Sequence, residues 1–260
     1  MRLRGAFRIA AVTATGGCPY QKAPDVTPSM ETLMTSKHFT RFAGALLAFL
    51  SASSATAEGA DASARPLVQE IDLALAAPSG GVIAVSYTPA FRLFERVNAG
   101  IGARATAFFG GDGVRFPTGD AARIAAGAKD VLTVDGPRSF AANLFISASL
   151  RVWLGLEIGA NIDLIGFGFG PSVTGAYAGA AASGPQSASP SHLGLLLFGK
   201  HDFGQLDSEF FLAYWLGPWG VRAGLSHMST EYTTDRPLDG GNDRFRASAT
   251  RFFGSFGHRF

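Results

Sequence analysis

The sequence predicts an all-β protein, built as a closed, antiparallel, up-and-down transmembrane β-barrel of eight strands. Three observations lead to this fold class. A segment with the layout of a signal peptide precedes the main part of the chain. Long segments after it alternate apolar and polar residues in steps of two, and aromatic residues gather where those segments end. Alternation with aromatic ends is typical of strands that cross an outer membrane.

The domain organisation follows from the first 57 residues. Lys37 and Arg41 form a positively charged region, residues 42–50 are apolar, and Ala55-Thr56-Ala57 is a small-x-small cleavage site. This order is that of a secretory signal peptide, and the apolar part is shorter than the ~20 residues of a spanning helix. We therefore expect an upstream extension over residues 1–33, a cleaved signal peptide over 34–57 and an outer-membrane barrel domain over 58–260.

Composition excludes several classes of function. The chain carries 22 Lys/Arg and 20 Asp/Glu. Residues 1–57 hold six of the basic and two of the acidic residues, so the rest of the chain has a net charge of −2. A nucleic-acid partner is not expected, because it would need a basic face. A single cysteine and scattered histidines indicate neither a disulfide nor a metal site, and we expect no cofactor.

Strict alternation is clearest in two segments. Every odd position is apolar from 97 to 107, and every even position is apolar from 154 to 164. Each strand then has one apolar face and one polar or small-residue face. A soluble sandwich would bury the apolar face, whereas a membrane barrel turns it to lipid. Segments of ten residues or more, with glycine and charges of both signs on the second face, favour the barrel.

Counting the strands requires a choice. The segments that qualify are 67–77, 82–93, 97–109, 139–151, 153–168, 192–203, 206–216, 219–233 and 243–260. Tight periplasmic turns are expected at 93–97, 150–153 and 216–219, and extracellular loops at 110–138, 170–191 and 234–242. A single-chain bacterial barrel has an even number of strands. We therefore assign 192–203 to a long extracellular excursion, which leaves eight strands. Ten strands, with one more hidden in 110–138 or 170–191, is the alternative.

The signal peptide, the glycine-rich alternating strands and the C-terminal phenylalanine resemble the small bacterial outer-membrane β-barrels of the OmpA/OmpX type. The resemblance rests on pattern over residues 66–260 and identifies no subfamily. It implies that the last strand carries an assembly signal, formed here by Phe252, Phe256 and Phe260, which the barrel-assembly machinery reads. His258 departs from that pattern. Outer-membrane lipid and lipopolysaccharide are the other expected partners.

The polar faces predict a network of charges in the lumen. Charges are retained in an interior when they are paired, and an eight-stranded interior is just wide enough for side chains to fill it. We expect these side chains to fill the lumen structurally; a narrow ion path lined by Arg104 and Glu157 is the alternative. The expected lumen residues are Glu70, Asp72, Arg104, Glu157, Asn161, Asp163, Glu209, Arg222 and Arg251.

One group of residues has a catalytic composition. His227, Ser229 and Glu231 share a strand face, and Asp243 opens the next strand. A hydroxyl, an imidazole and a carboxylate on one surface can act as nucleophile, base and orienting group. The His-x-Ser pair resembles the outer-membrane lipid A deacylase, although Thr230 stands where that family has asparagine. The favoured function is a structural or interaction role through loops 110–138 and 170–203. A narrow channel and a lipid A-modifying esterase are the alternatives.

Overall fold

The computed structural model describes residues 67–77, 80–178, 184–196, 203–238 and 241–260. The predicted upstream extension and signal peptide lie outside these described residues. Within the described ranges, the chain has no helix with the length and apolar character needed to cross a membrane.

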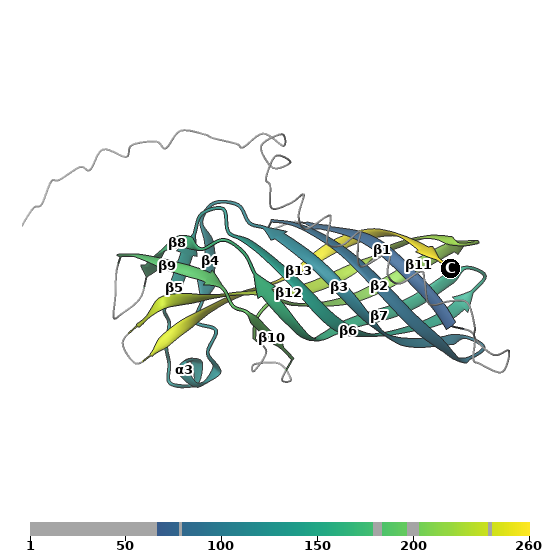
Figure 1. Ribbon diagram of the computed structural model, residues 1–260, viewed down its shortest axis with the longest axis horizontal. Coiled ribbons are helices and arrows are strands. Elements are labelled where there is room, and N and C mark those ends of the chain that lie inside the picture. The colour runs from purple at the N-terminus through teal and green to yellow at the C-terminus, as the bar shows by residue number, and fades with distance from the viewer. Residues whose placement is uncertain (1–66, 78–79, 179–183, 197–202, 239–240) are drawn as a thin grey trace, which may run out of the picture. The chain divides into compact units, whose positions relative to one another are not determined.

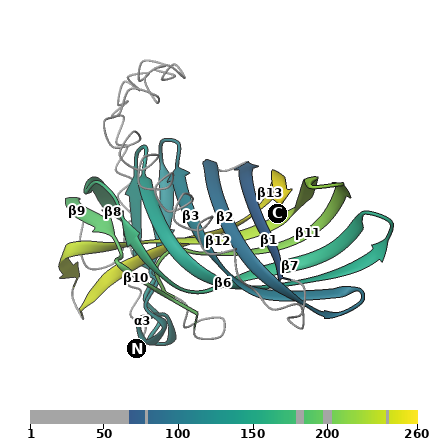
Figure 2. The same cartoon turned by 45° about the vertical axis from the view of Figure 1, so that its right-hand side comes forward.

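Eight long strands form a closed antiparallel barrel, as predicted (Figures 1 and 2). Each strand pairs with the next one in the barrel, and β13 pairs with β1 to close the ring, with Leu73 opposite Phe256. The strands are β1 (Leu67–Ala77), β2 (Gly81–Phe94), β3 (Val97–Phe109), β6 (Arg138–Trp153), β7 (Leu156–Phe169), β11 (Leu206–Leu216), β12 (Trp219–Leu238) and β13 (Asn242–Arg259).

The alternation of the sequence separates the two faces of the barrel wall. On β13, Phe252 and Phe256 are exposed on the outside, whereas the residue that precedes each of them, Arg251 and Ser255, is buried inside. Ile101 of β3 is likewise exposed on the outer wall. An outer surface this rich in exposed apolar side chains is unfavourable in water and favourable in lipid.

Short turns join the strands at one end of the barrel, which we call the turn end. The link between β6 and β7 is the dipeptide Leu154-Gly155, so the turn predicted at 150–153 is wrong. Gly155 has a φ of +74°, a conformation that favours glycine. The strand predicted to end at 151 therefore continues to Trp153 before the chain can reverse.

The opposite end, the loop end, is more regular than the sequence suggests. The predicted loop 110–138 contains β4 (Val114–Pro117), α3 (Ala121–Ala125) and β5 (Val131–Val134), and 170–191 contains β8 (Val173–Ala178) and β9 (Gly184–Pro190). The predicted loop 234–242 is wrong, because β12 continues to Leu238 and β13 begins at Asn242. The segment 192–203 contributes only β10 (Leu193–Leu195), a short strand paired to β7. Residues 197–202 of that segment lie outside the described residues.

Four of these short strands and the outer ends of β12 and β13 form a second closed ring, which we call the head (Figure 1). Its order is β12, β9, β8, β5, β4 and β13. The ring closes where Thr118 bridges to Phe245 and the Gly119 amide donates to the Arg244 carbonyl (2.7 Å). The head encloses its own apolar core of Phe116, Leu132, Val134, Tyr177, Ala188, Tyr232, Leu238 and Phe245.

Tyr232 connects the head to the barrel. Its ring packs edge-on against Phe116, and its hydroxyl donates to the Arg138 carbonyl at the loop end of β6 (2.9 Å). Burial raises the pKa of this hydroxyl. The head is therefore anchored both by continuous strands and by a buried side-chain contact.

Candidate functional site

The lumen is the candidate site, because the charged side chains of the barrel converge there. Strand alternation turns six carboxylates and six guanidinium groups inward. The carboxylates are Glu70, Asp72, Glu157, Asp163, Asp207 and Glu209, and the arginines are Arg92, Arg104, Arg151, Arg222, Arg251 and Arg259. The inward charges thus balance in number, although they are unevenly spread along the barrel.

Arg104 is the centre of one buried cluster. Its guanidinium lies 2.7 Å from a Glu209 oxygen, 3.4 Å from Asp207 and 3.5 Å from Asp163. Asn161 donates to the same Glu209 oxygen at 2.8 Å. The other two acids also accept hydrogen bonds from amide and hydroxyl groups, from Asn143 Nδ2 to Asp163 (2.6 Å) and from Ser226 Oγ to Asp207 (2.6 Å). We call this group the Arg104 cluster.

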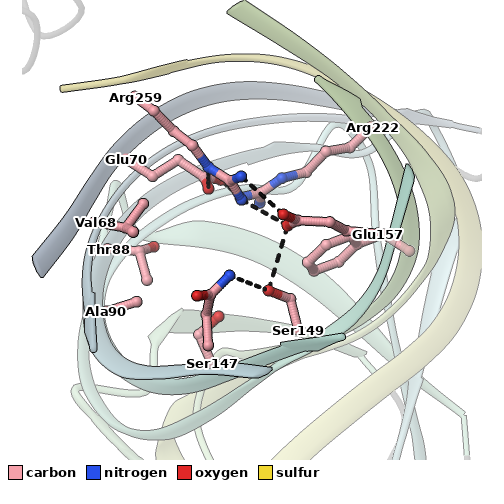
Figure 3. Close-up of a pocket in the computed structure, with 11 residues that line it drawn as sticks. Val68, Glu70, Thr88, Ala90, Ser147, Ser149, Glu157, Arg222 and Arg259 are labelled. Atoms are coloured by element: carbon pink, nitrogen blue, oxygen red, sulfur yellow. Dashed lines mark hydrogen bonds and ion pairs between the residues drawn. The ribbon is translucent and has the colours of Figure 1, made fainter. Parts of the chain in front are cut away.

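A second cluster crosses the lumen nearer the turn end (Figure 3). Arg259 makes two hydrogen bonds to Glu157, at 2.9 and 2.7 Å, and one to Glu70 at 3.1 Å. Arg222 pairs with Glu70 and, at 3.4 Å, with Asp72. In Figure 3, the side chains of Arg259 and Glu70 reach from one wall and those of Arg222 and Glu157 from the other, and they meet near the middle of the barrel. We call this group the Arg259 cluster.

Aromatic rings fill the space beside the inward arginines. The Arg104 guanidinium lies over the Phe145 ring at 4.9 Å, Arg222 over Phe211 at 4.5 Å and Arg259 over Trp215 at 3.6 Å. Each contact is within the range of a cation–π interaction. Phe108 lies beneath Arg251 in the same way, at 5.4 Å. The lumen is therefore occupied by alternating charged and aromatic side chains.

Two of the spaces lined by described residues lie at the turn end. The inner cavity has a volume of about 20 Å³, lies beside the Arg259 cluster and is lined by Thr88, Asn98, Ser149 and others (Figure 3). It has room for about one water molecule. A wider space of about 340 Å³, which we call the vestibule, lies at the turn-end mouth. Glu157 and Arg259 line both spaces, so their ion pair stands between them.

The structure places every residue of the expected lumen network on the inner face. It adds four charges that the sequence analysis did not select: Arg92, Arg151, Asp207 and Arg259. Alternation was a signal for two of them. Asp207 stands two positions before Glu209, and Arg259 stands eight positions after Arg251. Each is an even number of positions from a selected residue on its strand, so it points to the same inner face.

The catalytic group lies on β12 and β13, outside the lumen. His227 Nδ1 is 3.0 Å from Thr250 Oγ1, and Ser229 Oγ is 2.9 Å from Ser248 Oγ, so both side chains engage the neighbouring strand. Glu231 accepts two hydrogen bonds from Arg244, at 3.0 and 2.8 Å. Asp243 precedes Arg244 and therefore points to the opposite face of β13. The structure gathers three of the four residues on one face, each with a partner outside the group.

The three phenylalanines of the expected assembly signal, Phe252, Phe256 and Phe260, are exposed on the outer wall. His258 lies on the same face of β13. Its ring centroid is 4.2 Å from that of Trp219 and 4.9 Å from that of Phe260. The residue that departs from the family pattern is therefore part of an aromatic row at the turn end.

Together these features define a closed eight-stranded β-barrel with an apolar outer wall and a lumen filled by side chains. No family model matches the chain, and comparison with curated proteins gave no match. Among solved structures, the chain is similar to a major outer membrane protein from Thermus thermophilus, with 12% identity and a TM-score of 0.31 over 75% of this chain and 100% of the other. It is also similar to the CymD monoaromatic hydrocarbon channel, with 9% identity and a TM-score of 0.23 over 75% of this chain and 88% of the other. Membership of the OmpA/OmpX type stays a prediction.

Proposed function

We propose that this chain is a bacterial outer-membrane protein that acts as a non-conducting anchor and displays the head at the cell surface for a structural or interaction role. In this proposal the signal peptide directs export, the turn end faces the periplasm and the loop end faces outward. The exposed apolar outer wall supports membrane insertion. Short turns at one end and long excursions at the other support the orientation.

The observation that carries the non-conducting role is the double closure of the lumen. A permeating ion would have to pass both the Arg104 cluster and the Arg259 cluster. In each cluster the guanidinium groups hydrogen-bond carboxylates from other strands, as Arg104 does to Glu209 and Arg259 to Glu157. Opening such a cluster separates buried charges from their partners, which is strongly unfavourable. The inner cavity beside the Arg259 cluster has room for about one water molecule.

The observation that favours display is the folded head. Its apolar core is built from segments far apart in the sequence, including Phe116, Tyr177 and Phe245. A packed core fixes the outer surface of the head in one shape, which suits recognition of a partner better than unfolded loops would. Strands β12 and β13 hold this surface at a set position above the barrel.

Conductance in planar bilayers tests the non-conducting role. Purified protein whose folding is verified by heat-modifiable gel mobility is expected to add no single-channel steps. Discrete steps would instead favour the narrow channel. Arg259→Gln is an informative second variant, because it weakens one cluster and leaves the Arg104 cluster in place. It should stay non-conducting if both clusters close the lumen.

Excision of the head loop tests the display role. The Gly110 amide donates to the Pro137 carbonyl (2.8 Å), so the ends of segment 111–136 lie together and a short Gly-Ser link can replace it. The shortened protein is expected to keep the heat-modifiable mobility of the barrel. If it reverses the phenotype of a deletion strain as well as the full chain does, the head is not the functional part.

Lipopolysaccharide and the barrel-assembly machinery remain proposed partners. Polar residues on the outer wall near the loop end, His227 and Thr250 among them, support contact with lipopolysaccharide headgroups. Mass spectrometry of lipid A tests the esterase alternative. Lipid A that is identical in cells producing wild type and Ser229→Ala would dismiss an esterase that uses this serine.

A further inference from the structure

Along the barrel axis, three inward acidic side chains gather toward one end and three inward arginines at the other. Asp163, Asp207 and Glu209 gather around Arg104 in the loop-end half. Arginines instead occupy the last inward positions of three strands at the turn end. They are Arg92 of β2, Arg151 of β6 and Arg259 of β13, and all three line the vestibule. Glu157 is the one carboxylate among the described residues that line it.

Two of these three arginines are incompletely neutralised. Arg259 is satisfied by Glu157 and Glu70. Arg151 reaches Glu157 only at 3.9 Å, and its side chain is 40% exposed. Arg92 forms no ion pair with any described residue, and its buried Nε has no hydrogen-bond partner. Glu157 thus pairs with two of the three guanidinium groups, and its two short hydrogen bonds both go to Arg259.

The vestibule also has an apolar wall. Trp215, Leu154 and Val68 line it beside the arginines, and the guanidinium of Arg259 is stacked on the Trp215 ring. Its volume of about 340 Å³ is within the range of small-molecule sites. The floor is the Arg259–Glu157 pair seen in Figure 3, so a molecule that enters from the turn end stops there.

We propose that the vestibule is a binding site for a small organic anion, with a carboxylate or phosphate held by Arg92 and Arg151 and an apolar or aromatic part against Trp215 and Leu154. Guanidinium groups offer paired N–H donors that match both kinds of anion. Unpaired donors at the mouth of a site that also has an apolar wall favour a ligand with both characters over inorganic phosphate. The site is independent of whether the lumen conducts.

Isothermal titration calorimetry on the folded protein in a non-ionic detergent tests this proposal. The probes are phenyl phosphate and benzoate. Inorganic phosphate, which has the charge without the ring, and benzyl alcohol, which has the ring without the charge, are the two control compounds. We expect phenyl phosphate or benzoate to bind more tightly than either control compound. The stronger of the two identifies phosphate or carboxylate as the preferred group. Absence of binding by both aromatic anions overturns the proposal.

Variants locate the site. Arg92→Gln and Arg151→Gln should each weaken binding of the aromatic anion by about tenfold, the effect of one charge-assisted hydrogen bond. Arg115→Gln is the matched control, because Arg115 is exposed on β4 in the head, and it should leave the affinity unchanged. Equal affinity in all three variants would show binding elsewhere and overturn the proposal.

Trp215 offers a second readout. The chain has three tryptophans, and the other two, Trp153 and Trp219, are exposed on the outer wall. A background with both replaced by phenylalanine reports on the vestibule alone. Phenyl phosphate should change the Trp215 emission there, and Arg92→Gln should shift that change to about tenfold higher ligand concentration. An emission that stays constant through saturation would contradict a ligand lying against this ring.

Discussion

Arg104→Met should destabilise the barrel severely. Arg104 is 2% exposed, and its guanidinium lies within 3.5 Å of Glu209, Asp207 and Asp163. Methionine retains part of the side-chain volume but leaves these carboxylates in the lumen without their shared cation. Removing one partner of a buried ion pair costs about 3–5 kcal/mol. Since three acids lose their cation, we expect a loss of about 4 kcal/mol in the free energy of unfolding.

Urea unfolding in lipid vesicles, followed by tryptophan fluorescence and by heat-modifiable mobility, measures this loss. Arg151→Met is the matched control, because Arg151 is partly exposed and lies 3.9 Å from Glu157. A pair of that kind contributes at most about 1 kcal/mol. If Arg104→Met costs no more than Arg151→Met, the Arg104 cluster does not stabilise the lumen as argued.

A double variant tests the cause of the loss. Glu209→Gln in the Arg104→Met background removes one of the three uncompensated charges while keeping a polar group near Asn161. Part of the stability should return, so the two substitutions should be strongly non-additive. Simple additivity would mean that the arginine acts through packing on Phe145 instead of through its charge.

Three further predictions concern packing, the head and assembly. Gly102→Ala should destabilise the barrel by about 1–3 kcal/mol, because a Cβ there overlaps the Phe145 ring. Gly254→Ala should stay within ~0.5 kcal/mol in the same urea assay, because the nearest atom to a Cβ there, the Arg222 carbonyl oxygen, is 3.9 Å away. Phe116→Ala should make the head sensitive to protease by removing about 3–5 kcal/mol of packing from its core, with heat-modifiable mobility of the barrel unchanged; equal protease resistance would contradict an independent core. Phe260→Ala should slow insertion into vesicles that contain the assembly machinery and leave insertion into plain lipid unaffected, and equal slowing in both would point to lost lipid contact instead.

The barrel was predictable because its determinants are local. Alternation over ten or more residues identifies a membrane strand and its two faces, and Phe252 and Arg251 illustrate how cleanly the faces separate. Turn positions were less accessible. The error at 150–153 arose because Val152 and Trp153 still follow the strand, and only Gly155 can take the positive φ of the turn.

The head was missed because its strands are short and its core is not local. The strands β4 and β5 have four residues each, too few for alternation to stand out from composition. Phe116 and Leu132 are far from Tyr232 and Phe245 in sequence and join them in one core only in the folded chain. The pairings within the lumen were hidden for the same reason. Alternation in the sequence shows which side chains point into the lumen. Which arginine meets which acid depends on the stagger of the strands around the ring.

The shared strands of barrel and head also impose an order on biogenesis. Strand β9 completes its pairing with β12, and Thr118, directly after β4, bridges to Phe245 of β13, yet β12 and β13 follow both segments in the chain. In the proposed orientation, β4, β5, β8 and β9 therefore reach the outer side of the membrane before β12 and β13 are there to pair with them. A surface probe specific for the folded head would therefore count only molecules in which β12 and β13 are in place.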